Sequence, residues 1–198
     1  MSGKVRIIGG HLRGRILKVI DHQGLRPTAD RVRETLFNWL GQRLDGKVCV
    51  DIFAGSGALG FEALSRGAAK VWMNEATAPV VQALNVNYAK FSGDANLGTC
   101  EISKKDAINF LKSLPDQSVD ICFIDPPFSQ KELFKTSLEQ ALRVTRRDVG
   151  NGIYLEHPKD IDPNALLNDM PESLPFWTIG RTIRSGMATG VLFVPRTI

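Results

Sequence analysis

The glycine-rich stretch at residues 48–60 most constrains what this chain can fold into. Its first five residues are apolar except for Asp51, and such a run is typical of a strand buried on both faces at the centre of a parallel sheet. Gly55 and Gly57 permit a positive φ and let a ligand approach the backbone, while Gly60 lets the following helix pack close to the strand. The stretch therefore predicts a strand, a ligand-binding turn and a helix whose first amides face the ligand.

The spacing of these glycines does not by itself choose a ligand, because it fits a nicotinamide enzyme and a methyl-donor enzyme equally well. Asp51 adds information, since a carboxylate at the end of a buried strand is costly unless it has a partner. We expect Asp51 to meet a cationic or hydroxyl-bearing ligand. The alternative interpretation is that it accepts hydrogen bonds from the backbone amides of its own loop.

The composition is that of a globular protein with one main domain. The 198 residues include 43% hydrophobic residues, enough for a sizeable core and a small appendage. We expect no signal peptide and no membrane span, because no apolar run is long enough. Cys49, Cys100 and Cys122 are widely spaced in apolar runs, which indicates reduced core residues in a cytoplasmic protein and no metal site.

Basic residues are concentrated near the N-terminus. Residues 1–33 hold eight Lys or Arg and two Asp, a net charge of +6, whereas the rest of the chain carries −2. This asymmetry indicates a polyanionic partner, and we favour nucleic acid over a membrane surface. The alternative is a solvated basic face without a partner.

Two apolar runs that flank a glycine-rich turn predict a β-hairpin within residues 1–25. After it, Thr28 is placed to cap a helix through Leu40, whose apolar residues fall on one face. Arg31 and Arg33 lie away from that face in this prediction, free to meet a phosphate or a cofactor carboxylate. The basic residues that we expect to contact nucleic acid are Lys4, Arg6, Arg13, Arg15, Lys18, Arg31 and Arg33.

From residue 48 onward, strand-like and helix-like segments alternate, which is typical of a doubly wound α/β sheet. The last two strand-like runs, 177–184 and 187–194, predict an antiparallel hairpin that closes the sheet. We therefore expect an N-terminal β-hairpin extension at 1–25 and a mostly parallel, seven-stranded, Rossmann-like domain at 26–198. The strands expected before the closing hairpin lie near residues 48–52, 70–75, 99–103, 118–125 and 153–156.

Four acidic residues would lie together at the carboxyl ends of the parallel strands, where ligands of such sheets bind. They are Asp51, Glu75, Asp106 and Asp125. Glu75 follows Gly55 by twenty residues, a spacing at which a carboxylate can accept both ribose hydroxyls of a nucleoside. Asp106 is placed to contact an adenine amine, or alternatively to cap the helix that follows it.

The quartet Asp125-Pro126-Pro127-Phe128 is the most specific signal in the chain. The two prolines fix the backbone and remove two amide donors, so hydrogen-bond acceptors dominate the site. An exocyclic amine on a planar base fits such a site, with Phe128 stacking on its ring. The alternative interpretation is a rigid turn without chemistry.

Both motifs resemble those of known enzymes. The pattern Asp51-x-Phe53-x-Gly55-x-Gly57 resembles motif I of class I S-adenosylmethionine-dependent methyltransferases, in which the acid lies near the methionine amino group and the glycines line the cofactor. The quartet at 125–128 resembles motif IV of amino-methyltransferases that act on exocyclic nitrogens of nucleobases.

Further motifs extend this pattern over nearly the whole chain. They stand at residues 6–10, 13–15, 26–28 and 31–40, with Glu75, Asn85 and Asn87 beside the two central motifs. The pattern resembles the RsmD-like 16S ribosomal RNA guanine-N2 methyltransferases. The resemblance implies the cofactor S-adenosylmethionine, a guanine amine of the small ribosomal subunit or an assembly intermediate as the acceptor, and a cytoplasmic location with no membrane and no metal.

The resemblance also implies a division of roles. The expected cofactor contacts are Asp51, Phe53, Gly55, Gly57, Glu75 and Asp106. We expect Asp125 and the Pro126 carbonyl to accept the two hydrogens of the guanine amine, with Pro127 and Phe128 completing the catalytic group. Three other hypotheses stay open: an adenine-N6 methyltransferase acting on DNA or RNA, an NAD-dependent oxidoreductase, and a non-enzymatic RNA-binding protein.

Overall fold

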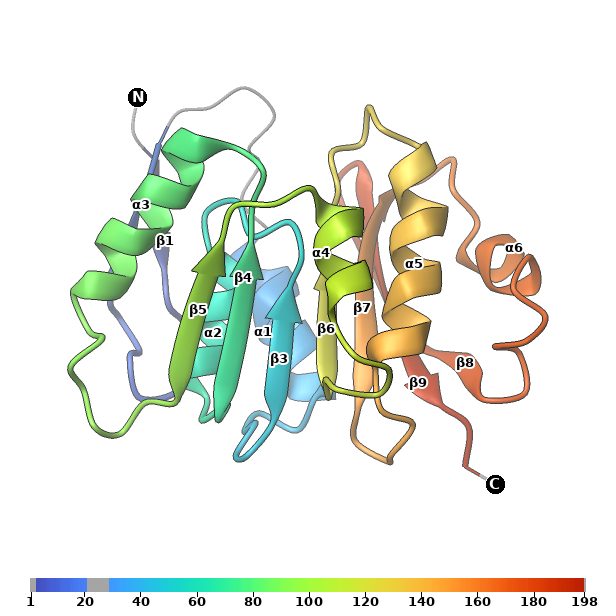
Figure 1. Cartoon of the computed structure of the whole chain (residues 1–198), viewed down its shortest axis with the longest axis horizontal. Coiled ribbons are helices and arrows are strands. Elements are labelled where there is room, and N and C mark those ends of the chain that lie inside the picture. The colour runs from blue at the N-terminus through green and yellow to red at the C-terminus, as the bar shows by residue number, and fades with distance from the viewer. Residues whose placement is uncertain (1–2, 21–28, 198) are drawn as a thin grey trace.

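The computed structural model describes residues 3–20 and 29–197. Within these residues, seven strands form a sheet in the order β5-β4-β3-β6-β7-β9-β8 (Figure 1). They are β3 (Val48–Asp51), β4 (Lys70–Asn74), β5 (Thr99–Ser103), β6 (Ile121–Ile124), β7 (Gly152–Pro158), β8 (Trp177–Ser185) and β9 (Ala188–Pro195). Neighbours from β5 to β7 are parallel, and β9 is antiparallel to both β7 and β8. The predicted mostly parallel sheet with an antiparallel closing hairpin is confirmed.

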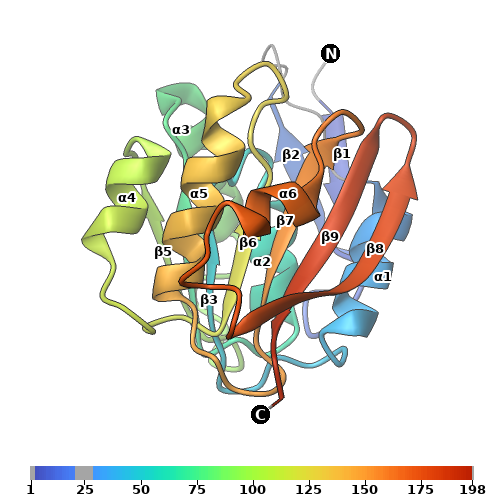
Figure 2. The same ribbon diagram turned by 90° about the vertical axis from the view of Figure 1, so that its right-hand side faces the viewer.

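Helices cover both faces of this sheet (Figure 1 and Figure 2). One core contains side chains of α1 (Asp30–Trp39), α2 (Ala58–Ser65) and α3 (Ala78–Ala89), and the other contains those of α4 (Ala107–Ser113), α5 (Glu132–Val144) and α6 (Pro163–Asn168). Successive residues of β3 serve the two cores: Cys49 lies in the first and Val50 in the second. Because side chains alternate along a strand, a strand covered on both faces must be apolar on both.

The turn after β3 has the conformation that its glycines predict. Gly55 and Gly57 have φ angles of +49° and +77°, which side chains rarely allow. A β-carbon on Gly60 would lie 2.5 Å from the sulfur of Met73, so glycine is needed for α2 to lie this close to β4. The backbone and packing roles predicted for these glycines are confirmed.

The N-terminal hairpin is a separate two-stranded sheet of β1 (Gly3–Arg6) and β2 (Ile16–Val19), with Lys4 opposite Lys18. Val5, Leu17 and Val19 are buried in the core that also contains α1 and α2, whereas Ile16 is exposed. The basic side chains that alternate with them are exposed. The hairpin therefore packs through its apolar face and presents a basic face to solvent.

A buried carboxylate ties the hairpin to these helices. Glu62 of α2 has no exposed surface and accepts hydrogen bonds from the amides of Ile8 (2.8 Å) and Gly9 (2.7 Å). The same carboxylate pairs with Arg66 at 2.9 Å and with Arg33 of α1 at 3.4 Å. The hairpin, α1 and α2 thus share one buried charged cluster.

This cluster overturns the expectation that Arg33 is free to meet a phosphate. The Arg33 side chain is fully buried, and it also donates to the Arg6 carbonyl (2.9 Å) and to Asp30 (2.6 Å). Its guanidinium pairs inside the fold because a buried charge needs hydrogen-bonded partners. Arg31 is exposed as expected, whereas Thr28, predicted to cap α1, lies outside the described residues.

We expect Glu62→Ala to lower the free energy of unfolding by about 3–5 kcal/mol, because it removes a partner of buried Arg33 and the acceptor of two hairpin amides. Lys135→Ala is the matched control, since it breaks an exposed ion pair with Asp169 and should change stability little. Urea titrations followed by circular dichroism measure both variants. Equal losses in the two would contradict the role assigned to Glu62.

Candidate active site

The carboxyl ends of the parallel strands form one edge of the sheet, and the strand order reverses between β3 and β6 (Figure 1). Asp51 ends β3 and lies opposite Met73 of β4 and Phe123 of β6. Glu75 follows β4 directly, and Asp125 follows β6. In α/β sheets ligands bind above such a reversal. The structure therefore brings these three acids to the edge at which the sequence places them.

The glycine loop between β3 and α2 is fastened to the end of β4. The Ala54 amide donates to the Asn74 carbonyl at 2.9 Å. The Glu75 carboxylate accepts from the Gly55 amide at 3.2 Å and from the Thr77 amide at 2.9 Å. These bonds orient Glu75 beside the loop, and its contact with ribose hydroxyls stays a prediction.

Asp51 is almost completely buried, and its carboxyl group accepts one hydrogen bond, from the Gly60 amide at 3.0 Å. The pKa of Asp51 is raised to about 7, chiefly by burial; the Gly60 amide opposes this rise, and the nearby charge of Glu75 adds to it. The bond to Gly60 is a backbone contact of the kind predicted as the alternative to a ligand contact for Asp51. A cation bound beside Asp51 would favour the ionised carboxylate, so the two roles are compatible.

Asp106 caps α4 through its side chain, which accepts from the Asn109 amide at 2.9 Å. The helix-capping role, which was the alternative prediction for Asp106, is therefore observed in the structure. The Asp106 side chain is also exposed at the edge that carries the other acids, and its contact with adenine stays a prediction.

Asn74 joins three strand ends, and sequence reasoning missed it. Its buried amide donates to the carbonyls of Ile52 (3.3 Å) and Lys105 (3.1 Å), and its oxygen accepts from the Ser103 hydroxyl at 2.8 Å. The available signal was an amide side chain at the end of an otherwise apolar strand. Asn74 therefore fixes the chain ends from which Asp51, Glu75 and Asp106 project.

The quartet at 125–128 follows β6 without regular secondary structure. Pro126 is buried, while Asp125 and Phe128 are half-buried. The Phe128 ring lies 6.3 Å from the Phe134 ring of α5, centroid to centroid, and is tilted by 50°. Packing on Phe134 orients the Phe128 ring at the sheet edge, and its stacking on a base stays a prediction.

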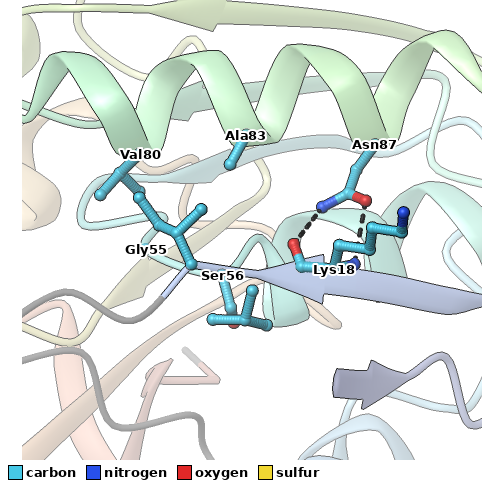
Figure 3. Close-up of a pocket in the computed structure, with 8 residues that line it drawn as sticks. Lys18, Gly55, Ser56, Val80, Ala83 and Asn87 are labelled. Atoms are coloured by element: carbon cyan, nitrogen blue, oxygen red, sulfur yellow. Dashed lines mark hydrogen bonds between the residues drawn. The ribbon is translucent and has the colours of Figure 1, made fainter. Parts of the chain in front are cut away.

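A small pocket separates the hairpin from the glycine loop and α3 (Figure 3). It is lined by Lys18, Val19, Ile20, Gly55, Ser56, Val80, Ala83 and Asn87. The buried Asn87 side chain accepts from the Lys18 amide at 3.0 Å and donates to the Lys18 carbonyl at 2.8 Å. We call this pair of bonds the Asn87 clamp, and it holds β2 against α3.

The basic residues predicted to contact nucleic acid are exposed, apart from Arg33. They are Lys4, Arg6, Arg13, Arg15, Lys18 and Arg31. At the hairpin turn, His11 pairs with Asp94 at 2.8 Å, so this histidine has a surface contact of its own.

No group of three or more metal-binding side chains occurs within residues 3–20 and 29–197. Cys49 and Cys122 are buried free thiols, as predicted for core residues, and Cys100 is half-buried. Burial raises the pKa of Cys100 to about 12. Among the described helices, none combines the length and apolar character that crossing a bilayer requires.

Comparison with known proteins gives a family and close relatives. The family model described as Conserved hypothetical protein 95 matches residues 5–174. The Ribosomal RNA small subunit methyltransferase D of Escherichia coli (strain K12) is 44% identical over 163 residues, which cover 77% of this chain and 79% of that relative. The protein of the same name from Haemophilus influenzae is 46% identical over 128 residues, covering 64% of this chain and 65% of that relative. The solved structure of yhhF from Escherichia coli matches with a TM-score of 0.77 at 36% identity and covers 98% of both chains.

We expect the stability of the unliganded protein to depend on the ionisation of Asp51. Between pH 4 and 7 the folded state keeps this proton and the unfolded state releases it, so the free energy of unfolding falls as pH rises through this window. Asp51→Asn keeps an acceptor for Gly60 and removes the effect. The free energy of unfolding of Asp51→Asn minus that of the parent should therefore be larger at pH 8 than at pH 4, by an amount on the order of 4 kcal/mol. Urea titrations of both proteins at the two pH values measure it, and a constant difference would contradict the assignment.

Proposed function

The chain belongs to the family described as Conserved hypothetical protein 95, and from this premise we propose that it transfers the methyl group of S-adenosylmethionine to the N2 amine of a guanine in 16S ribosomal RNA. Relatives named Ribosomal RNA small subunit methyltransferase D support methyl transfer as the reaction and small-subunit ribosomal RNA as the substrate. The observation that carries the proposal is the acceptor-rich quartet at 125–128, directly after β6 and next to β3 with its glycine loop. An amine above β6 and a methyl donor above β3 would lie side by side.

The residues after β3 fit a cationic methyl donor. S-adenosylmethionine supplies a methyl group on a positively charged sulfur and needs no further activation. Asp51 is a buried carboxyl group that a nearby cation would ionise, and the positive φ angles of Gly55 and Gly57 shape the turn that follows it. Phe53 lies in the same loop, while Glu75 would hold the ribose and Asp106 the adenine.

The acceptor site must work mainly by positioning. The N2 lone pair of guanine is delocalised into the ring, so the amine is a weak nucleophile. Asp125 and the Pro126 carbonyl would accept its two hydrogens and favour a pyramidal nitrogen, while Phe128 stacks on the base. Holding two reactants in attack geometry can supply roughly 7–11 kcal/mol. Asp125 or water then takes the proton that the methylated amine releases.

The basic hairpin supplies a contact surface for the RNA backbone. The target base must leave its stack or already lie in a loop to reach Asp125. The proposed partner is 16S ribosomal RNA within the small subunit or an assembly intermediate, and the proposed location is the cytoplasm. In this proposal residues 1–25 form an N-terminal RNA-binding element, and residues 26–198 form the methyltransferase domain.

An adenine-N6 methyltransferase is the second candidate, because the quartet at 125–128 also suits the amine of adenine. An NAD-dependent oxidoreductase or a non-catalytic RNA-binding protein would leave this quartet without a use. Methyl transfer to defined RNA separates these candidates.

The test is methyl transfer from labelled S-adenosylmethionine to small subunits, assembly intermediates and protein-free 16S ribosomal RNA. We expect label on the N2 of a guanine in one or more of these substrates. Label on adenine would support the second candidate, and no transfer to any RNA would contradict the proposal.

Asp125→Asn should lower kcat by at least about a hundredfold while donor affinity changes little, because it removes the charged acceptor of the amine hydrogens. Asp116→Asn, an exposed residue paired with Arg143, is the matched control and should keep parental kcat. Single-turnover kinetics and calorimetry measure the two quantities. Near-parental turnover in Asp125→Asn would eliminate the role assigned to Asp125.

Arg13→Ala/Arg15→Ala should flatten the slope of log RNA affinity against log salt by up to about 1.8, since each phosphate contact contributes about 0.7–0.9. Both arginines are exposed, so donor binding and folding should be unchanged. The matched control is Lys112→Ala/Lys135→Ala, which removes two exposed charges on α4 and α5, helices that pack in the core opposite the one that holds the hairpin. Filter binding across a salt series measures the slopes, and identical slopes in parent and hairpin variant would show that these arginines do not touch RNA.

A further inference from the structure

The strand next to β6 brings a second carboxylate to the quartet at 125–128. β6 and β7 are parallel, with Ile124 opposite Leu155 in the register. The next residues along the two strands are Asp125 and Glu156. Their side chains therefore leave neighbouring strands at the same level and on the same face of the sheet. Glu156 is half-buried there.

A buried tyrosine holds Glu156 in place. Tyr154 is fully buried, and its hydroxyl donates to the Glu156 carboxylate at 3.1 Å. Burial and the negative charges of Glu156 and Asp125 raise the pKa of Tyr154 well above its usual value, so the hydroxyl remains a donor. A β-carbon on Gly190 of β9 would lie 2.4 Å from this hydroxyl oxygen, so β9 leaves the ring little room to move.

We propose that Glu156 determines specificity for guanine by accepting the hydrogen on N1, while Asp125 and the Pro126 carbonyl hold the neighbouring N2 amine. The inference rests on the function proposed above and adds the contact that would distinguish guanine from adenine. Tyr154 is a positioning residue, because it acts through Glu156.

The chemistry of the two bases supports this assignment. Guanine presents the N1 hydrogen and the N2 amine side by side, and ionised carboxylates are acceptors only. Enzymes that act on an extruded base read it through this edge. Adenine carries no hydrogen at N1. Its N1 atom and the Glu156 carboxylate would face each other as two hydrogen-bond acceptors, and both would be left without a donor.

The test uses RNA in which the mapped target guanine is replaced by 2-aminopurine. This base keeps the amine at C2, but its N1 carries no hydrogen. It also lacks the guanine oxygen at C6, so the comparison between parent and variants, rather than the parent alone, isolates the N1 contact. The measured quantity is the ratio of kcat/KM for guanine to kcat/KM for 2-aminopurine.

We expect the parent to prefer guanine by roughly a hundredfold or more, as when a buried polar group loses its partner. Glu156→Gln should lower this ratio at least about tenfold, because an amide can donate to the bare N1 as well as accept from the N1 hydrogen. Tyr154→Phe should lower the ratio less, in the same direction. Glu172→Gln, an exposed residue after α6, is the control that keeps the parental ratio.

The outcomes separate this inference from the proposed function. A parental ratio in both Glu156→Gln and Tyr154→Phe overturns the inference alone, as do equal rates on the two bases in the parent. A merely structural role would lower both rates together and leave the ratio unchanged. If Glu156→Gln does not fold, the ratio of Tyr154→Phe decides. If the parent methylates no guanine, the proposed function and the inference are both overturned.

Discussion

The buried carboxylate of Glu62 is the contact on which the arrangement of this molecule depends. A buried charge is tolerated only when it is paired and hydrogen-bonded, and the donors to Glu62 come from the hairpin, from α1 and from the end of its own helix. The hairpin amides and the arginines of α1 and at the end of α2 pair with Glu62, and without one another these groups would be buried and unpaired. This mutual requirement seats the hairpin against α1 and α2, on one face of the sheet.

At the strand ends, the backbone and the proposed ligands would share the same carboxylates. Asp51, Glu75 and Asp106 each accept hydrogen bonds from nearby amides. A carboxylate has about four lone-pair sites, so these bonds orient the group without exhausting its capacity. Asn74 adds rigidity, because one buried amide links the ends of β3, β4 and β5. Such preorganisation is what catalysis by positioning requires.

Local patterns were sufficient to predict much of this fold. The strand at 48–51, the positive φ of Gly55 and Gly57 and the order of the strands all follow from residue types at short range, whereas the short helix α6 was not predicted. Arg33 shows where this reasoning ends, because helical periodicity places it away from the apolar face. Its burial depends on Glu62, 29 positions later, and on a carbonyl of the hairpin. The roles of Asn74 and Asn87 were missed for the same reason: their partners lie on distant segments, and a single amide has no periodicity.

The Asn87 clamp also protects an edge. In the register Lys18 stands opposite Lys4 of β1, yet its own amide and carbonyl bond to the Asn87 side chain on the other side of β2. Exposed strand edges with unpaired backbone groups invite pairing with another copy of the chain. The Asn87 amide occupies the place that an incoming strand would take, and the charged side chains of the hairpin repel a second hairpin of the same kind. The hairpin can therefore expose its basic face to solvent without acting as a template for aggregation.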